Sequence, residues 1–195
     1  MKQSIFVLPL AAAFALSACI SFGSKPPPVL MRLTSSATLQ ANASRTAGPG
    51  EAITVVVPTV PQELATLRVP VRTGATQVAY LKDAQWVETP NALFARLLSE
   101  TIAATTGRAV LDSRQFSVSP GVRLTGQLQA FGVDADGGEA VIVYDAALAR
   151  AADRVETRRF EARVPVSPVD ANTVPAALNQ AANQVADEVA RWIQG

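Results

Sequence analysis

Histidine is absent from this chain of 195 residues, and cysteine occurs once, as Cys19. Without histidine, the serine–histidine–aspartate and cysteine–histidine arrangements of hydrolases cannot form. Zinc sites built from cysteine and histidine are excluded for the same reason. The acidic residues are scattered along the chain, and no convergent set of them suggests a paired-carboxylate catalyst. We therefore predict that the protein is not an enzyme and uses no metal or other cofactor.

An excess of charge of one sign is also lacking. Seventeen Lys and Arg residues oppose sixteen Asp and Glu residues, and no long block of either sign occurs. Nucleic-acid binding needs concentrated positive charge, as does electrostatic docking on anionic membranes. The composition therefore argues against a nucleic-acid partner.

The first 18 residues have the parts of a secretory signal peptide. Lys2 supplies positive charge, residues 5–16 form the apolar core, and the small Ser17 and Ala18 precede the cleavage position. The apolar run is too short to span a bilayer, which needs about 20 residues. The tetrapeptide at residues 16–19, Leu-Ser-Ala-Cys, resembles the lipobox of bacterial lipoproteins. We expect removal of residues 1–18 and lipidation of Cys19.

Lipidation at Cys19 predicts a tethered protein. Two or more acyl chains hold a protein on a membrane almost permanently. In lipoproteins of this kind, an Asp after the cysteine usually signals retention in the inner membrane. Here that position holds Ile20, so the resemblance implies the outer membrane, facing the periplasm. Residues 20–28 contain Gly, Ser and three Pro residues and are expected to form a flexible-to-extended tether.

Residues 29–195 are expected to form one α+β domain: a mixed, mostly antiparallel sheet with two helices packed on one face. A helix is predicted from Pro90, with Thr89 as its cap and Gly107 past its end. A second helix is predicted over residues 174–193. Each shows an apolar stripe at helical spacing. Short strands are expected at residues 29–33, 52–57, 77–81 and 109–111.

A β-meander is expected between the two helices. Apolar and polar residues alternate in residues 122–131 and again in 157–166, which is typical of half-buried strands. Residues 139–149 between them are apolar on both faces, which predicts a central strand. The Asp136-Gly137 pair predicts the turn that joins the first two of these strands.

Residues 58–76 contain Pro58, Pro61 and Pro70 among apolar residues. Because proline removes hydrogen-bond donors from a sheet, this stretch predicts a surface excursion and not a central strand. Apolar side chains in or beside it belong either to the core or to a surface for a partner or lipid, and its arginines are either rim contacts or solvated. The candidate surface residues are Leu64, Leu67, Arg68, Val71, Arg72, Tyr80 and Trp86.

The order and spacing of several segments resemble one family. The marks are the strand–proline unit at 53–58, the segment at 67–72, residues 80–86 leading into the helix at 90–106, the meander with Phe131, Val133 and Asp134, and the Ala/Gln-rich final helix. Over residues 29–193 the chain resembles the ABC-type transport auxiliary lipoproteins, which include the PqiC-like lipoproteins. It departs from them at Val29-Leu30, where the family often has paired tyrosines, and the family commonly has a more polar segment before the helix tryptophan.

This resemblance implies a non-enzymatic part of an intermembrane lipid transport system. Such systems pair a cytoplasmic ATPase and a permease with an MCE-domain protein that bridges the periplasm. The resemblance implies that the lipoprotein docks the far end of that bridge at the outer membrane. Some relatives assemble as rings, so the resemblance also allows a homo-oligomer for this chain. Two alternatives stay open: a lipid-binding periplasmic carrier, and an assembly lipoprotein of another envelope machine.

Overall fold

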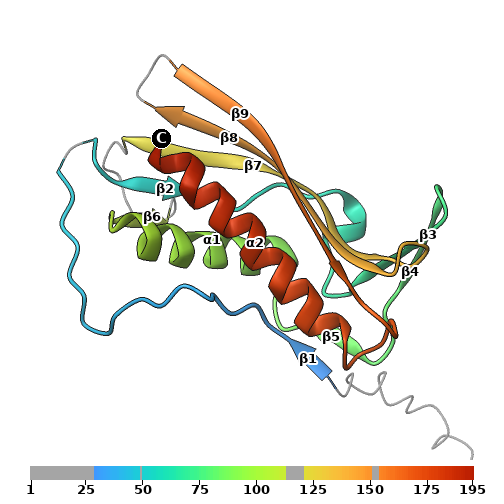
Figure 1. Ribbon diagram of the computed structural model, residues 1–195. Coiled ribbons are helices and arrows are strands. Elements are labelled where there is room, and N and C mark those ends of the chain that lie inside the picture. The colour runs from blue at the N-terminus through green and yellow to red at the C-terminus, as the bar shows by residue number, and fades with distance from the viewer. Residues whose placement is uncertain (1–28, 49, 113–120, 151–153) are drawn as a thin grey trace, which may run out of the picture.

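The computed structural model describes residues 29–48, 50–112, 121–150 and 154–195, so the predictions for the signal peptide, Cys19 and the tether lie outside the described residues. The elements are β1 (Val29–Met31), β2 (Ile53–Val55), the short 3₁₀-helix η1 (Gln62–Leu64), β3 (Pro70–Thr73), β4 (Gln77–Tyr80), β5 (Ala84–Trp86), α1 (Pro90–Thr106), β6 (Val110–Asp112), β7 (Val122–Asp134), β8 (Glu139–Arg150), β9 (Arg154–Pro165) and α2 (Val174–Gln194). Figure 1 shows both helices on one face of a curled mixed sheet, which confirms the predicted fold class.

The meander of β7, β8 and β9 forms the largest part of the sheet. β8 pairs antiparallel with β7 on one side and with β9 on the other, so it is central, as its two apolar faces predicted. On β9 the alternating pattern turns Phe160, Ala162 and Val164 into the core. The turn between β7 and β8 includes Asp136 and Gly137, as the sequence predicted.

The second edge of β7 is shared by two short strands. β2 pairs in parallel with the start of β7, and β3 pairs in parallel with its end. β2 also pairs with β6, and β3 with β4. The prediction that residues 58–76 contain no internal strand is therefore wrong, because β3 lies between β4 and β7. Pro70 is the first residue of β3, a strand position where a missing N–H is tolerated.

The helix α1 begins and ends at the residues that the sequence marked. Pro90 occupies its first turn, and Gly107 adopts the left-handed conformation (φ 69°) that ends a helix at little steric cost. The predicted cap is not made, because the Thr89 side chain forms no capping hydrogen bond. The apolar stripe is buried as predicted, with Leu97 and Leu98 among the core residues.

The helix α2 packs on β8, β9 and α1 and is fixed at both ends. Before its first turn, the Asp170 carboxylate accepts hydrogen bonds from the backbone N–H groups of Asn172 (2.8 Å) and Thr173 (3.0 Å), which lower the pKa of Asp170. At its last turn, Arg150 donates to the carbonyl of Ile193 at 2.9 Å. Such contacts satisfy backbone groups that a helix end leaves unpaired.

Aromatic rings join the helices to the sheet in the core. Phe94 of α1 lies edge-on to Phe131 of β7 and to Tyr144 of β8, with ring centroids 6.1 and 5.3 Å apart. Trp86 contacts Phe131 in the same way at 5.3 Å. All four rings are buried, and edge-to-face pairs of this kind add about 0.5–1.5 kcal/mol each beyond their area burial.

A second, two-stranded sheet was not predicted. β1 pairs in parallel with β5, in the register Leu30 to Gln85 and Met31 to Trp86. Its inner side chains, Met31 and Trp86, are buried in the main core. β1 and β5 lie at the end of the molecule where the described chain begins, opposite the carboxyl terminus (Figure 1). Among the described residues, no helix is long and apolar enough to cross a membrane.

We expect the change Leu97→Asp to unfold the domain. Leu97 is buried on the inner face of α1, and an unpaired carboxylate there would cost on the order of 4 kcal/mol or more, a large part of a typical domain's stability. The volume-conserving control Leu97→Met should cost less than about 1.5 kcal/mol. Urea denaturation followed by circular dichroism measures both, and an unchanged midpoint for Leu97→Asp would show that this helix face is assigned wrongly.

Candidate functional site

Potential metal ligands do not converge in the described part of the chain. No cluster of three or more His, Cys, Asp or Glu residues there could hold a metal ion. Several acidic side chains are instead paired with arginines across the sheet surface. The candidate sites described below are therefore the exposed surfaces of the domain.

Two of the predicted surface residues lie in the core. Leu64 and Trp86 are buried, which is the alternative that the sequence left open for them. The Trp86 indole N–H has no hydrogen-bond partner among the described atoms, so this residue contributes mainly apolar contact. Neither side chain is available to a partner in this conformation.

Three other predicted residues lie close together beside β5. The backbone N–H of Trp86 donates to the carbonyl of Leu67 at 2.7 Å, which places residue 67 along the free edge of β5. The Arg68 guanidinium stacks over the Tyr80 ring, 4.1 Å from its centroid, in a cation–π contact. Leu67 is 40% exposed. The structure thus brings together three of the predicted residues: Leu67 and Arg68, which are exposed, and Tyr80, which is half-buried.

The last two predicted residues, Val71 and Arg72, lie on β3. Val71 is half-buried and pairs with Val133 of β7. Arg72 forms an ion pair with Glu63 and also donates to the carbonyl of Gln129 at 3.4 Å. Arg72 therefore fastens η1 and β3 to β7, and it is not a fully solvated side chain.

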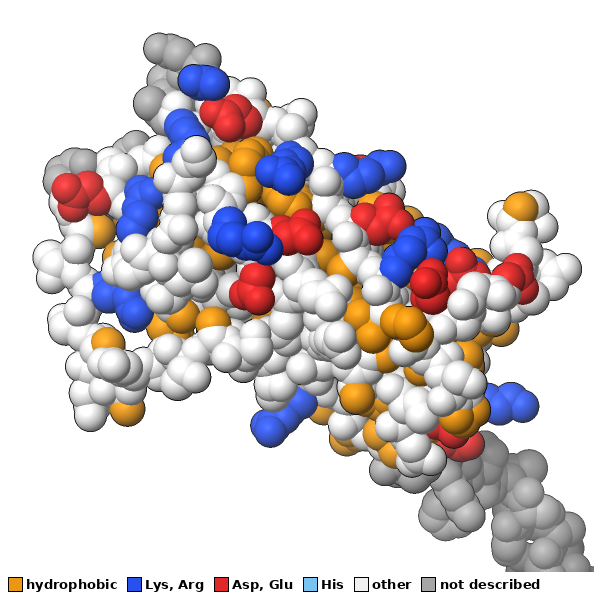
Figure 2. All heavy atoms as spheres, in the orientation of Figure 1, with side chains coloured by type: hydrophobic (Ala, Val, Ile, Leu, Met, Phe, Trp, Pro, Cys, Tyr) orange, Lys and Arg blue, Asp and Glu red, His pale blue; other side chains and the backbone are white. Residues whose placement is uncertain are grey.

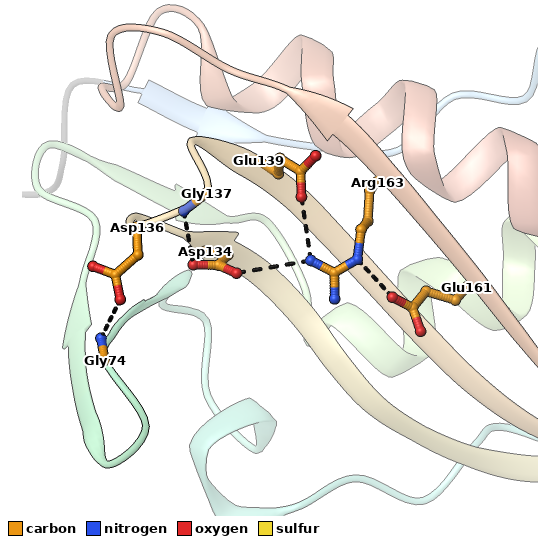
Figure 3. A network of polar contacts seen from close by, with 7 residues as sticks. All are labelled: Gly74, Asp134, Asp136, Gly137, Glu139, Glu161 and Arg163. Atoms are coloured by element: carbon orange, nitrogen blue, oxygen red, sulfur yellow. Dashed lines mark hydrogen bonds and ion pairs between the residues drawn. The ribbon is translucent and has the colours of Figure 1, made fainter.

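A polar network holds the tips of two hairpins near β3 (Figure 3). The Asp136 carboxylate in the β7–β8 turn accepts a hydrogen bond from the Gly74 N–H at 2.6 Å, which connects that turn to the β3–β4 turn. Arg163 of β9 pairs with Glu161 (2.6 Å) and Glu139 (3.2 Å). These carboxylates raise the pKa of the Arg163 guanidinium, which stays charged.

A small pocket of about 120 Å³ lies beside this network, lined in part by Arg72, Phe131 and Arg163. Sites for small molecules usually enclose about 300–1,000 Å³. The pocket is therefore too small to hold a lipid chain, and the network serves to fix the hairpins.

The outer face of the meander carries a second pairing. Arg159 donates from Nε and Nη2 to the Asp145 carboxylate at 2.6 and 2.7 Å, and Gln129 donates to the same group at 3.0 Å. The bonds from Arg159 are the main cause of the lowered pKa of Asp145. This face therefore presents the Arg159–Asp145 ion pair to solvent.

Sequence reasoning missed two exposed apolar residues on the small sheet. Leu30 and Val87 are 62% and 50% exposed. Leu30 stands opposite Gln85, and Val87 follows two residues later on the same strand line, with its N–H bonded to the carbonyl of Met31 at 2.9 Å. Because side chains alternate along a strand, Leu30, Gln85 and Val87 share the outer face.

We call Leu30 and Val87 the tether-proximal surface. Figure 2 shows hydrophobic side chains on the exterior at the end of the molecule formed by β1 and β5. Strands of three residues are too short for an alternating pattern to appear, so only the pairing of β1 with β5 reveals this surface.

Comparisons with known proteins agree with the fold. A family model described as "ABC-type transport auxiliary lipoprotein component" matches residues 33–190. The crystal structure of protein XCC0632 from Xanthomonas campestris, assigned to the DUF330 family, is similar with a TM-score of 0.63 and 21% identity over 86% of this chain and 92% of that one. A second crystal structure, of an uncharacterized protein, gives a TM-score of 0.65 and 18% identity over 77% and 96%. No curated protein matches the chain.

We expect Gly132→Ala to loosen the β3–β4 hairpin. A Cβ atom at residue 132 would lie 2.4 Å from the Pro70 carbonyl oxygen, so β3 must move away from β7. Overpacking of this kind costs about 1–3 kcal/mol. Hydrogen exchange of the β3 and β4 amides, with urea denaturation, should show faster exchange and lower stability.

The control is Gly137→Ala, whose added Cβ would meet its nearest atoms at 3.5 Å, an ordinary contact. This variant should stay within about 0.5 kcal/mol of the parent. Equal exchange rates in the two variants would contradict the close approach of β3 to β7.

Proposed function

We propose a function on the premise that this chain belongs to the family of ABC-type transport auxiliary lipoprotein components. The family match over residues 33–190 is the observation that carries the proposal. It makes the protein an auxiliary component of ABC-type transport and implies a location in the cell envelope. The finer proposal is an adaptor, anchored in the outer membrane, that docks the MCE-domain protein of an intermembrane lipid transport system.

The distribution of chemistry on the surface supports an adaptor. The described residues offer paired charges and exposed apolar side chains, and they bring together no metal-ligating cluster. An auxiliary component acts by binding other proteins of the transport system. A surface of this kind provides such contacts without a reaction centre. We therefore propose a non-enzymatic role.

The anchor is proposed from the sequence. Cys19 stands at the end of a lipobox-like tetrapeptide, and Ile20 follows it in place of the Asp that usually retains such lipoproteins in the inner membrane. Lipidation of Cys19 would fix the domain to the periplasmic face of the outer membrane through a tether of nine residues, 20–28.

The β3–β4 hairpin is the proposed partner surface. It carries Arg68 and Tyr80 at its base and Val71 and Arg72 on β3, and it projects beyond the helices in Figure 1. β4 is an edge strand whose Val78 is 43% exposed. A free strand edge with an exposed apolar side chain is a common docking element for another protein. Assembly as a homo-oligomer would repeat this surface.

The packing of α2 favours the adaptor over a lipid carrier. A carrier would have to open the interface between helix and sheet to admit an acyl chain. That interface contains Leu178, Val185 and Val189, all fully buried. Opening it would expose the core, at a cost of about 25 cal/mol for each Å² of apolar surface.

We expect Cys19→Ala to abolish function through loss of the anchor. The variant should appear as soluble or unprocessed protein on membrane fractionation and fail to complement a deletion strain. Ser21→Ala, two residues along the tether, keeps the lipidation position and should behave like the parent. Normal complementation by Cys19→Ala would refute the anchored mechanism.

We expect a photocrosslinking amino acid at Val78 to capture the MCE-domain protein in intact cells. The matched control replaces Val155, which is 65% exposed and lies at the start of β9 at the other end of the molecule. Pull-down and mass spectrometry would identify the adducts. If neither position, nor chemical crosslinking of the native protein, recovers an MCE protein or permease, the adaptor function is wrong.

A further inference from the structure

We infer that the tether-proximal surface, Leu30 and Val87, rests on the phospholipid leaflet that holds the anchor. The inference rests on the proposed lipidation of Cys19 and goes beyond it, because it assigns an orientation to the domain. A lipid anchor alone would leave the domain free to turn. Contact through these side chains would present one end to the membrane and the opposite end to the periplasm.

Covalent geometry keeps this surface near the membrane. Ten residue steps separate Cys19 from Val29, and a fully extended chain covers at most about 3.6 Å per step, which limits the distance to about 35 Å. Leu30 is the next residue along the chain. The helix α2 runs away from this end for 21 residues, or about 32 Å at 1.5 Å per residue. The small sheet is therefore the part of the described domain that joins the tether directly, and α2 carries the rest of the domain away from it.

The side chains on this surface suit the boundary between headgroups and acyl chains. Leu30 and Val87 project from the outer face of a sheet whose inner face, Met31 and Trp86, is fixed in the core. Apolar residues presented by a rigid element can enter this boundary to a depth of about 5–10 Å. The free energy of these apolar side chains is lower in this boundary than in water.

Charged side chains flank the apolar ones. Arg32 follows Leu30 on the same strand line and is exposed, as is Lys82 before β5, and no ion pair joins either of them to another described residue. Such side chains can reach lipid phosphates while their stems cover apolar surface. Asp83 lies beside Lys82, so the local net charge is small and apolar contact carries the inference.

The small extent of the surface favours a membrane over a protein as its occupant. A stable protein interface buries about 800 Å² on each partner, more than two exposed side chains supply. A membrane contact needs no such area, because the acyl chains already hold the domain in place.

Lipid quenching of a fluorescent probe tests the orientation. The full lipidated protein is placed in phosphatidylcholine vesicles with brominated acyl chains, and an environment-sensitive probe is attached at Leu30→Cys or at Val155→Cys. Acylation consumes the Cys19 thiol, so the introduced cysteine is the one that reacts. The two positions are matched in exposure, at 62% and 65%, and lie at opposite ends. Contact predicts at least about fivefold stronger quenching at residue 30, since only that probe reaches the acyl boundary.

A second pair of variants separates contact from mere closeness to the tether. With the probe at Gln85→Cys, on the same outer face, Leu30→Ser with Val87→Ser should reduce quenching at least about twofold, because the apolar side chains no longer enter the leaflet. Val155→Ser in the same background should leave it unchanged. Equal quenching in the double variant and its control would overturn the inference.

The other outcomes distinguish this inference from the proposed function. Absence of quenching at Leu30→Cys in a protein whose mass shows an acylated Cys19 overturns the membrane contact and leaves the adaptor standing. Quenching without any recovered MCE partner supports the contact and removes the adaptor. An unacylated Cys19 overturns the anchor together with the contact. Loss of a homo-oligomer in the Leu30→Ser, Val87→Ser variant without loss of quenching would assign the surface to a second copy and overturn the inference.

Discussion

The strand β7 is the constraint on which the rest of the structure depends. One of its edges is paired with β8 along almost its whole length, and the other is divided between β2 and β3. Its inner face carries Leu124, Leu128 and Phe131 against the helices. The described domain contains no disulfide or metal cluster, so burial of these apolar side chains has to offset the chain entropy lost on folding.

Two regions outside the β7–β8–β9 meander are held in place for different proposed contacts. In one region, Arg72 fastens β3 to β7, Gly132 of β7 allows β3 to approach closely, and the bond from Gly74 to Asp136 joins the β3–β4 turn to the β7–β8 turn. At the start of the described chain, β1 adds to β5 and carries exposed apolar side chains. Under the proposed function, one of these regions meets a protein and the other a membrane. Both depend on rigid pairing, which keeps short segments in fixed places.

The long periodic segments could be predicted from the sequence, and the short ones could not. The apolar–polar periodicity of β7, β9, α1 and α2 extends over many residues. The buried face of each element can therefore be predicted from the sequence alone. β5 has three residues and no pattern, and β3 begins with a proline that argued for a surface excursion. Of the seven candidate surface residues, local patterns could not separate buried Leu64 and Trp86 from exposed Leu67, because all are apolar.

The sequence by itself determined the absence of histidine chemistry, the expected lipidation position at Cys19, the two helices and the meander, since each depends on composition or on a local repeat. Only the tertiary structure decided that β3 is internal, that Trp86 is core, and that Leu30 and Val87 share an outer face. The physical reason is that exposure depends on which distant segments cover a residue. Pairings such as β1 with β5 join residues more than fifty positions apart, and no local pattern encodes them.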